Sequence, residues 1–85
     1  MDYFEKYPIG NCCVCSQGWV VIVKEISIPK YFVYCNECET EWAHPEDFIL
    51  RQKSSRFKYE DFSEPNDKEV IDIGWYKYID QTMLQ

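Results

Sequence analysis

The sequence is poor in the side chains that most enzymes use for catalysis. It contains a single histidine, and no recognisable nucleophile or phosphate-binding loop accompanies it. Nucleophilic catalysis and phosphate binding need such groups in defined sets. We therefore expect that this protein is not an enzyme.

Basic residues are also scarce. Nine Lys and Arg residues stand against fifteen Asp and Glu residues, which gives a formal net charge of −6. Proteins that bind the phosphate backbone of nucleic acids take much of their affinity from Lys and Arg. The charge argues against a general nucleic-acid partner and favours a basic protein partner.

The chain lacks a long hydrophobic run. Its most apolar stretch, Trp19–Val23, is followed at once by Lys24 and Glu25, whereas a membrane-spanning helix needs about 20 apolar residues. The first six residues are acidic and aromatic, unlike the basic and then apolar start of a signal peptide. We expect no membrane partner and a cytoplasmic location.

The length of 85 residues predicts a single domain that spans residues 1–85. Below about 70 to 80 residues, a hydrophobic core alone rarely supplies more than about 3 to 5 kcal/mol, so a covalent or metal cross-link is expected. The five cysteines offer one. Disulfides are rare in a reducing compartment, and an odd number of cysteines cannot pair fully, which favours metal or redox chemistry.

The first half of the chain predicts strands. Trp19–Ile28 is rich in β-branched residues and is stopped by Pro29, and Tyr31–Tyr34 predicts the second strand of a hairpin. Tyr7–Asn11 predicts a turn because it contains Pro and Gly. Glu39–Trp42 alternates weakly and predicts a third strand.

The second half predicts short helices. His44–Asp47 places a proline in a first helical turn and carboxylates at its positive end, with a helix through Leu50. Ser63–Asp67 predicts a second helix start, and Gly74 a cap or a break. The apolar residues expected to line a helical face are Val70, Ile71, Ile73, Trp75, Tyr78 and Ile79. The pattern leaves open whether this part forms one kinked helix or two short ones.

Two C-x2-C pairs carry the strongest chemical signal. They are Cys12 with Cys15 and Cys35 with Cys38, with 19 residues between the pairs. Each pair forms a tight turn that directs two thiolates at one centre, and the hairpin brings the two turns together. Four thiolates at about 2.3 Å are the ligands of closed structural zinc sites. The expected fold class is small α+β, a zinc ribbon of two knuckles joined by a β-hairpin, with one or two short C-terminal helices and Zn²⁺ as cofactor.

Other uses of the cysteines remain open. Iron in a rubredoxin-type centre takes the same four ligands, although Ser16 and Glu39 stand where such proteins usually have Gly. Two disulfides or a thioredoxin-like redox pair fit the compartment and the pattern less well. Cys13 is left over, and we expect it to fill a small buried space or to substitute for Cys12. His44 is expected to be a surface or capping residue, with metal binding or a partner contact as the alternative.

Residues 12–48 resemble the small stand-alone zinc-ribbon proteins of bacteria. In those proteins the first knuckle usually reads Cys-Pro-x-Cys-Gly-x-Gly, and the second reads Cys-x-Glu-Cys, then an acidic residue and Trp, then a Pro-Glu-Asp helix start. This chain departs at Cys13, where Pro is usual, and at Ser16, where Gly is usual. The resemblance implies a ribbon core over 9–48, with residues 49–85 as a helical extension packed on it. It implies that zinc is bound by Cys12, Cys15, Cys35 and Cys38.

Some proteins of this kind resemble immunity proteins, which are small, acidic and cytosolic and which neutralise a secreted or contact-delivered toxin. The analogy implies that this chain binds and occludes a cognate toxin, expected to be a basic nuclease. The carboxylates expected in the contact are Glu37, Glu39, Glu41, Glu46, Asp47, Glu60, Asp61, Glu64 and Asp67. The alternative is a nucleic-acid or transcription-associated ribbon. It would use a basic stretch with a neighbouring aromatic residue, namely Arg51, Lys53, Arg56 and Lys58 with Phe57 or Tyr59.

Overall fold

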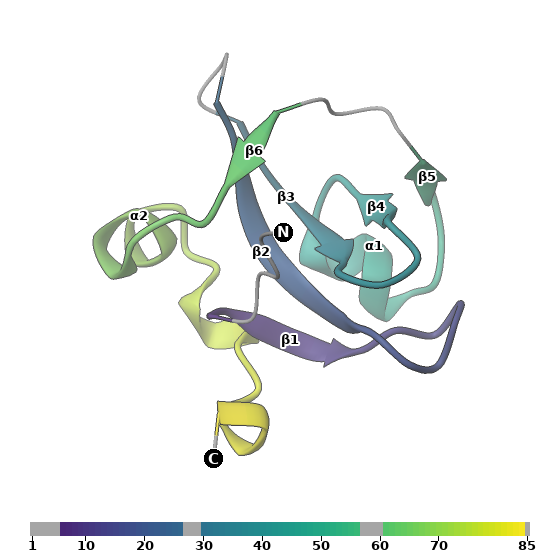
Figure 1. The fold of residues 1–85 in the computed structure, drawn as a ribbon. Helices are drawn as coiled ribbons and strands as arrows, with labels where there is room; N and C mark the ends of the chain where they lie inside the picture. The colour runs from purple at the N-terminus through teal and green to yellow at the C-terminus, as the bar shows by residue number, and fades with distance from the viewer. Residues whose placement is uncertain (1–5, 27–29, 57–60, 85) are drawn as a thin grey trace.

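The computed structural model describes residues 6–26, 30–56 and 61–84. They form a small α+β fold with an antiparallel sheet and two short helices (Figure 1). Within these residues no helix has both the length and the apolar character that a membrane crossing requires. The elements in chain order are β1 (Pro8–Asn11), β2 (Trp19–Glu25), β3 (Lys30–Cys35), β4 (Thr40–Trp42), α1 (Pro45–Ile49), β5 (Ser55–Arg56), β6 (Phe62–Ser63), α2 (Asp67–Asp72) and the 3₁₀ helices η1 (Tyr76–Tyr78) and η2 (Gln81–Leu84).

The predicted hairpin forms the centre of the sheet. β2 and β3 pair antiparallel from Val20 opposite Cys35 to Glu25 opposite Lys30. The strand order is β1-β2-β3-β4-β5, and β6 pairs with β2. The expected strand over Trp19–Ile28 ends at Glu25 in the structure, and its last two residues lie outside the described part. The predicted third strand is present as β4.

The first predicted turn is instead an edge strand. Residues 8–11 pair with β2 as β1, and the register shifts between Pro8 and Gly10. Proline is tolerated at the start of a strand and at an edge, where no ladder hydrogen bond needs its missing N–H. The Pro and Gly residues therefore mark a strand start and an irregularity in the pairing, which the turn prediction did not distinguish.

The C-terminal part is not only helical. It contributes β5, which pairs with β4, and β6, which continues the edge of β2 beyond β1. α2 starts at the Asn66 cap and is followed by Gly74 in the left-handed region, with φ of 78°. Two separate 3₁₀ helices, η1 and η2, then follow, so this part forms one short α-helix and two 3₁₀ turns and not one kinked helix.

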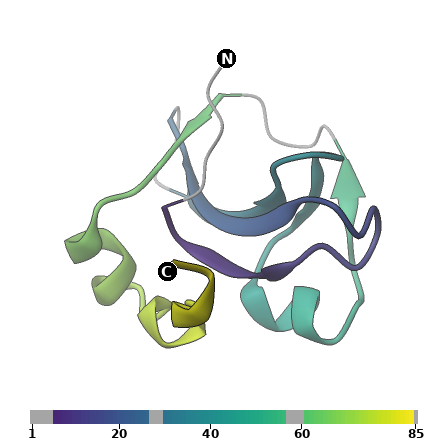
Figure 2. The same ribbon diagram turned by 60° about the horizontal axis from the view of Figure 1, so that its bottom comes forward.

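The two faces of the sheet bury different residues. Alternation along β2 directs Val20 and Ile22 to one face and Val21 and Val23 to the other. Both helices and both 3₁₀ helices lie on one side of the sheet (Figure 2). On that side the core includes Val70, Trp75 and Ile79 as well as Trp42. Ile71 was expected on the same apolar face but is 57% exposed, since the helix turns it outward.

Candidate metal centre

The four predicted cysteines lie together at one end of the hairpin. The Sγ atoms of Cys12, Cys15, Cys35 and Cys38 all lie within 4.8 Å of one another. The Sγ atoms of Cys12 and Cys38 are 3.7 Å apart, and those of Cys15 and Cys35 are 3.6 Å apart. Ligands about 2.3 Å from a central ion in tetrahedral geometry would be about 3.8 Å from each other. The donor set therefore fits a tetrahedral thiolate-bound metal ion.

The first knuckle folds back onto the start of β2. The N–H of Cys12 donates to the Gly18 carbonyl at 2.9 Å, which closes the loop. Two further backbone N–H groups point at sulfur, from Val14 to Cys12 at 3.3 Å and from Gly18 to Cys15 at 3.4 Å. A Cβ atom at Gly18 would lie 2.5 Å from the Cys35 sulfur. Glycine is therefore needed there because the two knuckles approach each other closely.

The second knuckle directly follows β3. The N–H groups of Glu37 and Cys38 point at the Cys35 sulfur, each at 3.4 Å. Asn36 ties the second knuckle to the start of β2, because its side-chain oxygen accepts from the Trp19 N–H and its own N–H donates to the Trp19 carbonyl, both at 3.0 Å. N–H groups directed at sulfur stabilise the thiolate form that a metal requires.

Thr40 is a member of this site that the sequence did not point to. Its hydroxyl oxygen lies 3.2 Å from the Cys38 sulfur, and the residue is 5% exposed. A threonine two residues after a cysteine does not by itself predict this contact, because the contact depends on the direction in which β4 leaves the second knuckle. Asn36 was missed for the same reason, because its partner Trp19 belongs to the other strand.

The four thiols differ in acidity. Burial raises the pKa of Cys35 and of Cys12. Burial also raises the pKa of Cys38, but hydrogen bonds with the Thr40 side chain and backbone and with the Cys35 and Cys12 thiols together outweigh it and bring the pKa to about 6. Backbone hydrogen bonds from Gln17 and Gly18 lower the pKa of Cys15. Each knuckle thus pairs one buried thiol with one more readily ionised thiol, and a cation held by the four sulfur atoms would favour ionisation of the buried pair.

The fifth cysteine and the histidine lie outside the cluster. Cys13 is exposed, so the expectation that it fills a small buried space is wrong: the knuckle directs Cys12 inward and the next side chain outward. His44 caps α1, accepting the Glu46 N–H at Nδ1 at 3.0 Å. Its ring also packs edge-on against Trp75 with 5.2 Å between centroids. The capping role expected from the sequence is confirmed.

The predicted contact carboxylates fall into two groups on opposite sides of the β2–β3 hairpin (Figure 1). One group follows β3 and includes Glu37 and Glu39, both exposed, with Glu46 and the half-buried Asp47 in α1. The other lies near β6 and α2. It consists of exposed Asp61 and Asp67 and half-buried Glu64, while Glu60 lies outside the described residues.

Glu41 does not belong to the acidic surface. It is 2% exposed, and it accepts a hydrogen bond from the Ser55 hydroxyl at 3.2 Å. β4 lies between β3 and β5, so both of its edges are covered and its middle residue is enclosed. The expectation that Glu41 contacts a partner through the exposed surface is therefore wrong.

The basic stretch of the alternative hypothesis lies in the loop after α1. Arg51, Lys53 and Arg56 are exposed, while Lys58, Phe57 and Tyr59 lie outside the described residues. Arg51 and Lys53 adopt positive φ angles of 54° and 57°, so the loop is tightly folded here. The described basic residues belong to β5 and to the loop before it.

Comparisons with family models, with curated proteins and with solved structures find no match for this chain, and the assignment of the site rests on its geometry.

Proposed function

We propose that the four cysteines hold one structural Zn²⁺ ion. The observation that carries this proposal is the tetrahedral spacing of four sulfur atoms from two knuckles. Four thiolates complete the coordination of zinc, so no position is left for a water molecule or a substrate. When bound, the ion cross-links the β1–β2 and β3–β4 connections and supplies stability that a small core lacks.

We further propose that the zinc ribbon is a platform for binding a basic protein, and that this partner is a toxin which the chain neutralises by occlusion. The support is the net charge of −6 together with exposed carboxylates on the second knuckle. An acidic surface accelerates encounter with a basic partner and repels other acidic proteins. The toxin as partner rests on the resemblance to immunity proteins.

The second knuckle is the favoured contact site. Glu37 and Glu39 flank the ligand Cys38, and the backbone of this turn is fixed by its hydrogen bonds to sulfur and by the contact with Thr40. Charges on a turn that is already rigid reach a partner with a smaller loss of conformational entropy than charges on a loose loop. Metal binding would therefore hold the recognition surface in place without taking part in it.

Two charge reversals of equal size test the partner proposal and locate the contact. Glu37→Lys with Glu39→Lys changes the first group, and Asp61→Lys with Glu64→Lys changes the second. We expect the first pair to slow association with a basic partner recovered from the native cell, and to reduce protection of cells that make the toxin. The second pair is the matched control for overall charge, and zinc content is measured in both.

Equal loss in both pairs would mean that only overall charge matters. Unchanged protection in both, together with no basic partner on co-purification, would overturn the toxin proposal. The zinc proposal is tested separately, by counting metal ions per chain with native mass spectrometry. A tetrahedral iron centre, recognised by its visible absorption, would replace zinc while leaving the four ligands unchanged.

A further inference from the structure

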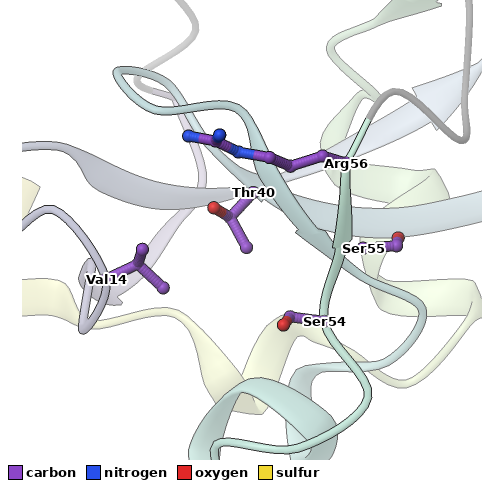
Figure 3. Close-up of a pocket in the computed structure, with 5 residues that line it drawn as sticks. All are labelled: Val14, Thr40, Ser54, Ser55 and Arg56. Carbon is purple, nitrogen blue, oxygen red and sulfur yellow. The ribbon is translucent and has the colours of Figure 1, made fainter.

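A pocket lies beside the metal centre and has no role in the functions proposed above. Its volume is about 420 Å³, and it is lined by Val14, Thr40, Ser54, Ser55 and Arg56. These residues come from the first knuckle, from β4, and from β5 with the loop before it. In Figure 3 the Arg56 side chain reaches across the pocket above Thr40, with Ser54 on the opposite side and Val14 facing them.

Arg56 provides the charge of the pocket. One N–H of its guanidinium donates to the Cys38 carbonyl at 2.9 Å, which fixes the direction of the side chain. Among the described residues, no carboxylate lies within ion-pair distance of Arg56. A guanidinium has five N–H donors in a planar fork, so the contact with Cys38 leaves donors for another acceptor.

The remaining lining suits the same kind of acceptor. The Ser54 hydroxyl adds a donor below the Arg56 side chain (Figure 3), whereas the Thr40 hydroxyl is already engaged with the Cys38 sulfur. Val14, 56% exposed, offers an apolar wall. Arg51 and Lys53 lie in the loop that leads to Ser54 and β5 and are also exposed. Arg with hydroxyl donors is the combination that binds carboxylate and phosphate groups in bidentate fashion.

Negative groups nearby limit the affinity. Glu37 and Glu39 lie on either side of Cys38, and four thiolates around a dication leave a net negative charge. The pocket opens to solvent through exposed residues, so water and salt screen these charges over about 8 to 10 Å. Salt weakens a direct hydrogen bond to Arg56 less than it weakens long-range attraction. The pocket therefore favours a ligand that enters it and contacts Arg56.

From these observations we propose that the pocket binds the oxyanion of a carboxylate or phosphate group, with Arg56 as the anchoring residue and the Ser54 hydroxyl as a further donor. The same oxyanion chemistry is offered by an acidic side chain of a protein and by a small organic acid or phosphate. The site lies beside the acidic residues Glu37 and Glu39 of the second knuckle, and it offers a contact of the opposite polarity.

The test is an NMR titration of the full chain at constant ionic strength, with chloride as the balancing ion. The probes are propionate, its neutral isostere propionamide, and inorganic phosphate. We expect saturable shifts at the N–H groups of Thr40 and Ser54 and at the Arg56 side chain with at least one anion, and none with propionamide. The anion that binds with the higher affinity shows whether the pocket prefers a carboxylate or a phosphate group.

Three variants distinguish specific binding in the pocket from non-specific electrostatic attraction of anions. Arg56→Gln should weaken anion binding by at least about tenfold, since a charge-assisted hydrogen bond is lost. Lys53→Gln removes the same charge three residues earlier in the chain, outside the pocket lining, and should weaken binding by less than about twofold, as expected for a screened charge. Ser54→Ala removes a donor without touching the cysteine turn and should also weaken binding.

The proposal is overturned if the shifts do not saturate, if propionamide produces the same shifts, or if Lys53→Gln weakens binding as much as Arg56→Gln. Because Arg56 also contacts the second knuckle, metal content and the amide shifts of β2 are measured in each variant. If Arg56→Gln alters the fold, Ser54→Ala decides: unchanged affinity in that variant then counts against the site. None of these results depends on the toxin proposal.

Discussion

Ser16 and Glu39 adopt the same left-handed backbone conformation, with φ of 62° and 63°, and each directly follows the second cysteine of its pair. The two knuckles are therefore built alike, although neither carries the glycine that this conformation favours. The left-handed region costs an L-residue about 1 to 2 kcal/mol. Both turns thus carry a local strain that the rest of the site holds in place.

Replacing these residues by glycine should stabilise the protein. We expect Ser16→Gly and Glu39→Gly each to raise the free energy of unfolding by about 0.5 to 1 kcal/mol, because relief of the left-handed strain exceeds the entropic cost of glycine. Chemical denaturation of the metal-loaded chain measures this. Gln17→Gly is the control: it lies in the same turn without a positive φ and should destabilise or have no effect. Destabilisation by all three would show that the turns are not strained.

The cysteines should divide into four essential residues and one dispensable one. Cys15→Ser or Cys38→Ser should lose the metal and much of the folded structure, since metal binding and folding share their free energy in such sites. Cys13→Ser should change stability by less than about 0.5 kcal/mol, because the side chain is exposed. Metal counting and circular dichroism report both effects. A fully folded chain after exhaustive chelation would contradict this prediction.

Glu69 should contribute a stability that is constant near neutral pH. Its carboxylate accepts from Lys24 Nζ at 2.6 Å and from the Tyr31 hydroxyl at 3.1 Å, and so ties α2 to β2 and β3. The hydrogen bond with Lys24 holds the pKa of Glu69 below its usual range. A lowered folded-state pKa gives stability that is present above the unfolded pKa of about 4.3 and is lost as the pH falls through the folded value.

We therefore expect Glu69→Gln to lower stability by the same amount across about pH 6 to 8, and the deficit to narrow only below about pH 4.3. Denaturation at several pH values measures this deficit at pH values high enough for the cysteines to keep the metal. An NMR titration of the Glu69 carboxyl group gives its pKa directly. Asp72→Asn breaks the exposed pair with Lys68 and should have little effect. A deficit that changes between pH 6 and 8 would assign the effect to another group.

Glu39 and Glu41 lie two residues apart, but replacement by Lys should lower the stability of the protein at only one of them. Glu41→Lys places a cation in a site that is 2% exposed and should cost at least about 2 kcal/mol of stability. Glu39→Lys changes an exposed charge and should be tolerated. Thermal unfolding with metal counting compares them. Equal tolerance of both would mean that β4 is not enclosed in solution.

Nucleic-acid binding should be absent at physiological ionic strength. The exposed basic residues Arg51, Lys53 and Arg56 act within a chain of net charge −6, and few phosphate contacts give weak binding that salt suppresses. A gel-shift series with random DNA and RNA at increasing salt checks this. Submicromolar binding that weakens steeply with salt, and is lost when these three residues are replaced by Gln, would favour the nucleic-acid alternative.

The sequence predicted the parts of the fold that depend on local pattern. Cysteine spacing located the four-cysteine cluster, β-branched runs located the hairpin, and capping residues located both helix starts. The short strands β5 and β6 were missed because two residues carry no periodicity and their pairing is decided by distant partners. Glu41 was misplaced for a related reason, since its burial depends on β5 covering β4, which the alternation around it does not encode.

The pairing of β2 has a consequence for the chain when the metal is lost. β3 covers one edge of β2, and β1 followed by β6 covers the other. The enclosed segment Trp19–Val23 is uncharged and rich in β-branched residues, which is the composition of segments that stack into amyloid-like sheets. Removing the ion would loosen the knuckles at the ends of β1 and β3 and uncover both edges. We therefore predict that chelated protein self-associates through this segment, in which case the proposed metal ion would also protect the chain against aggregation.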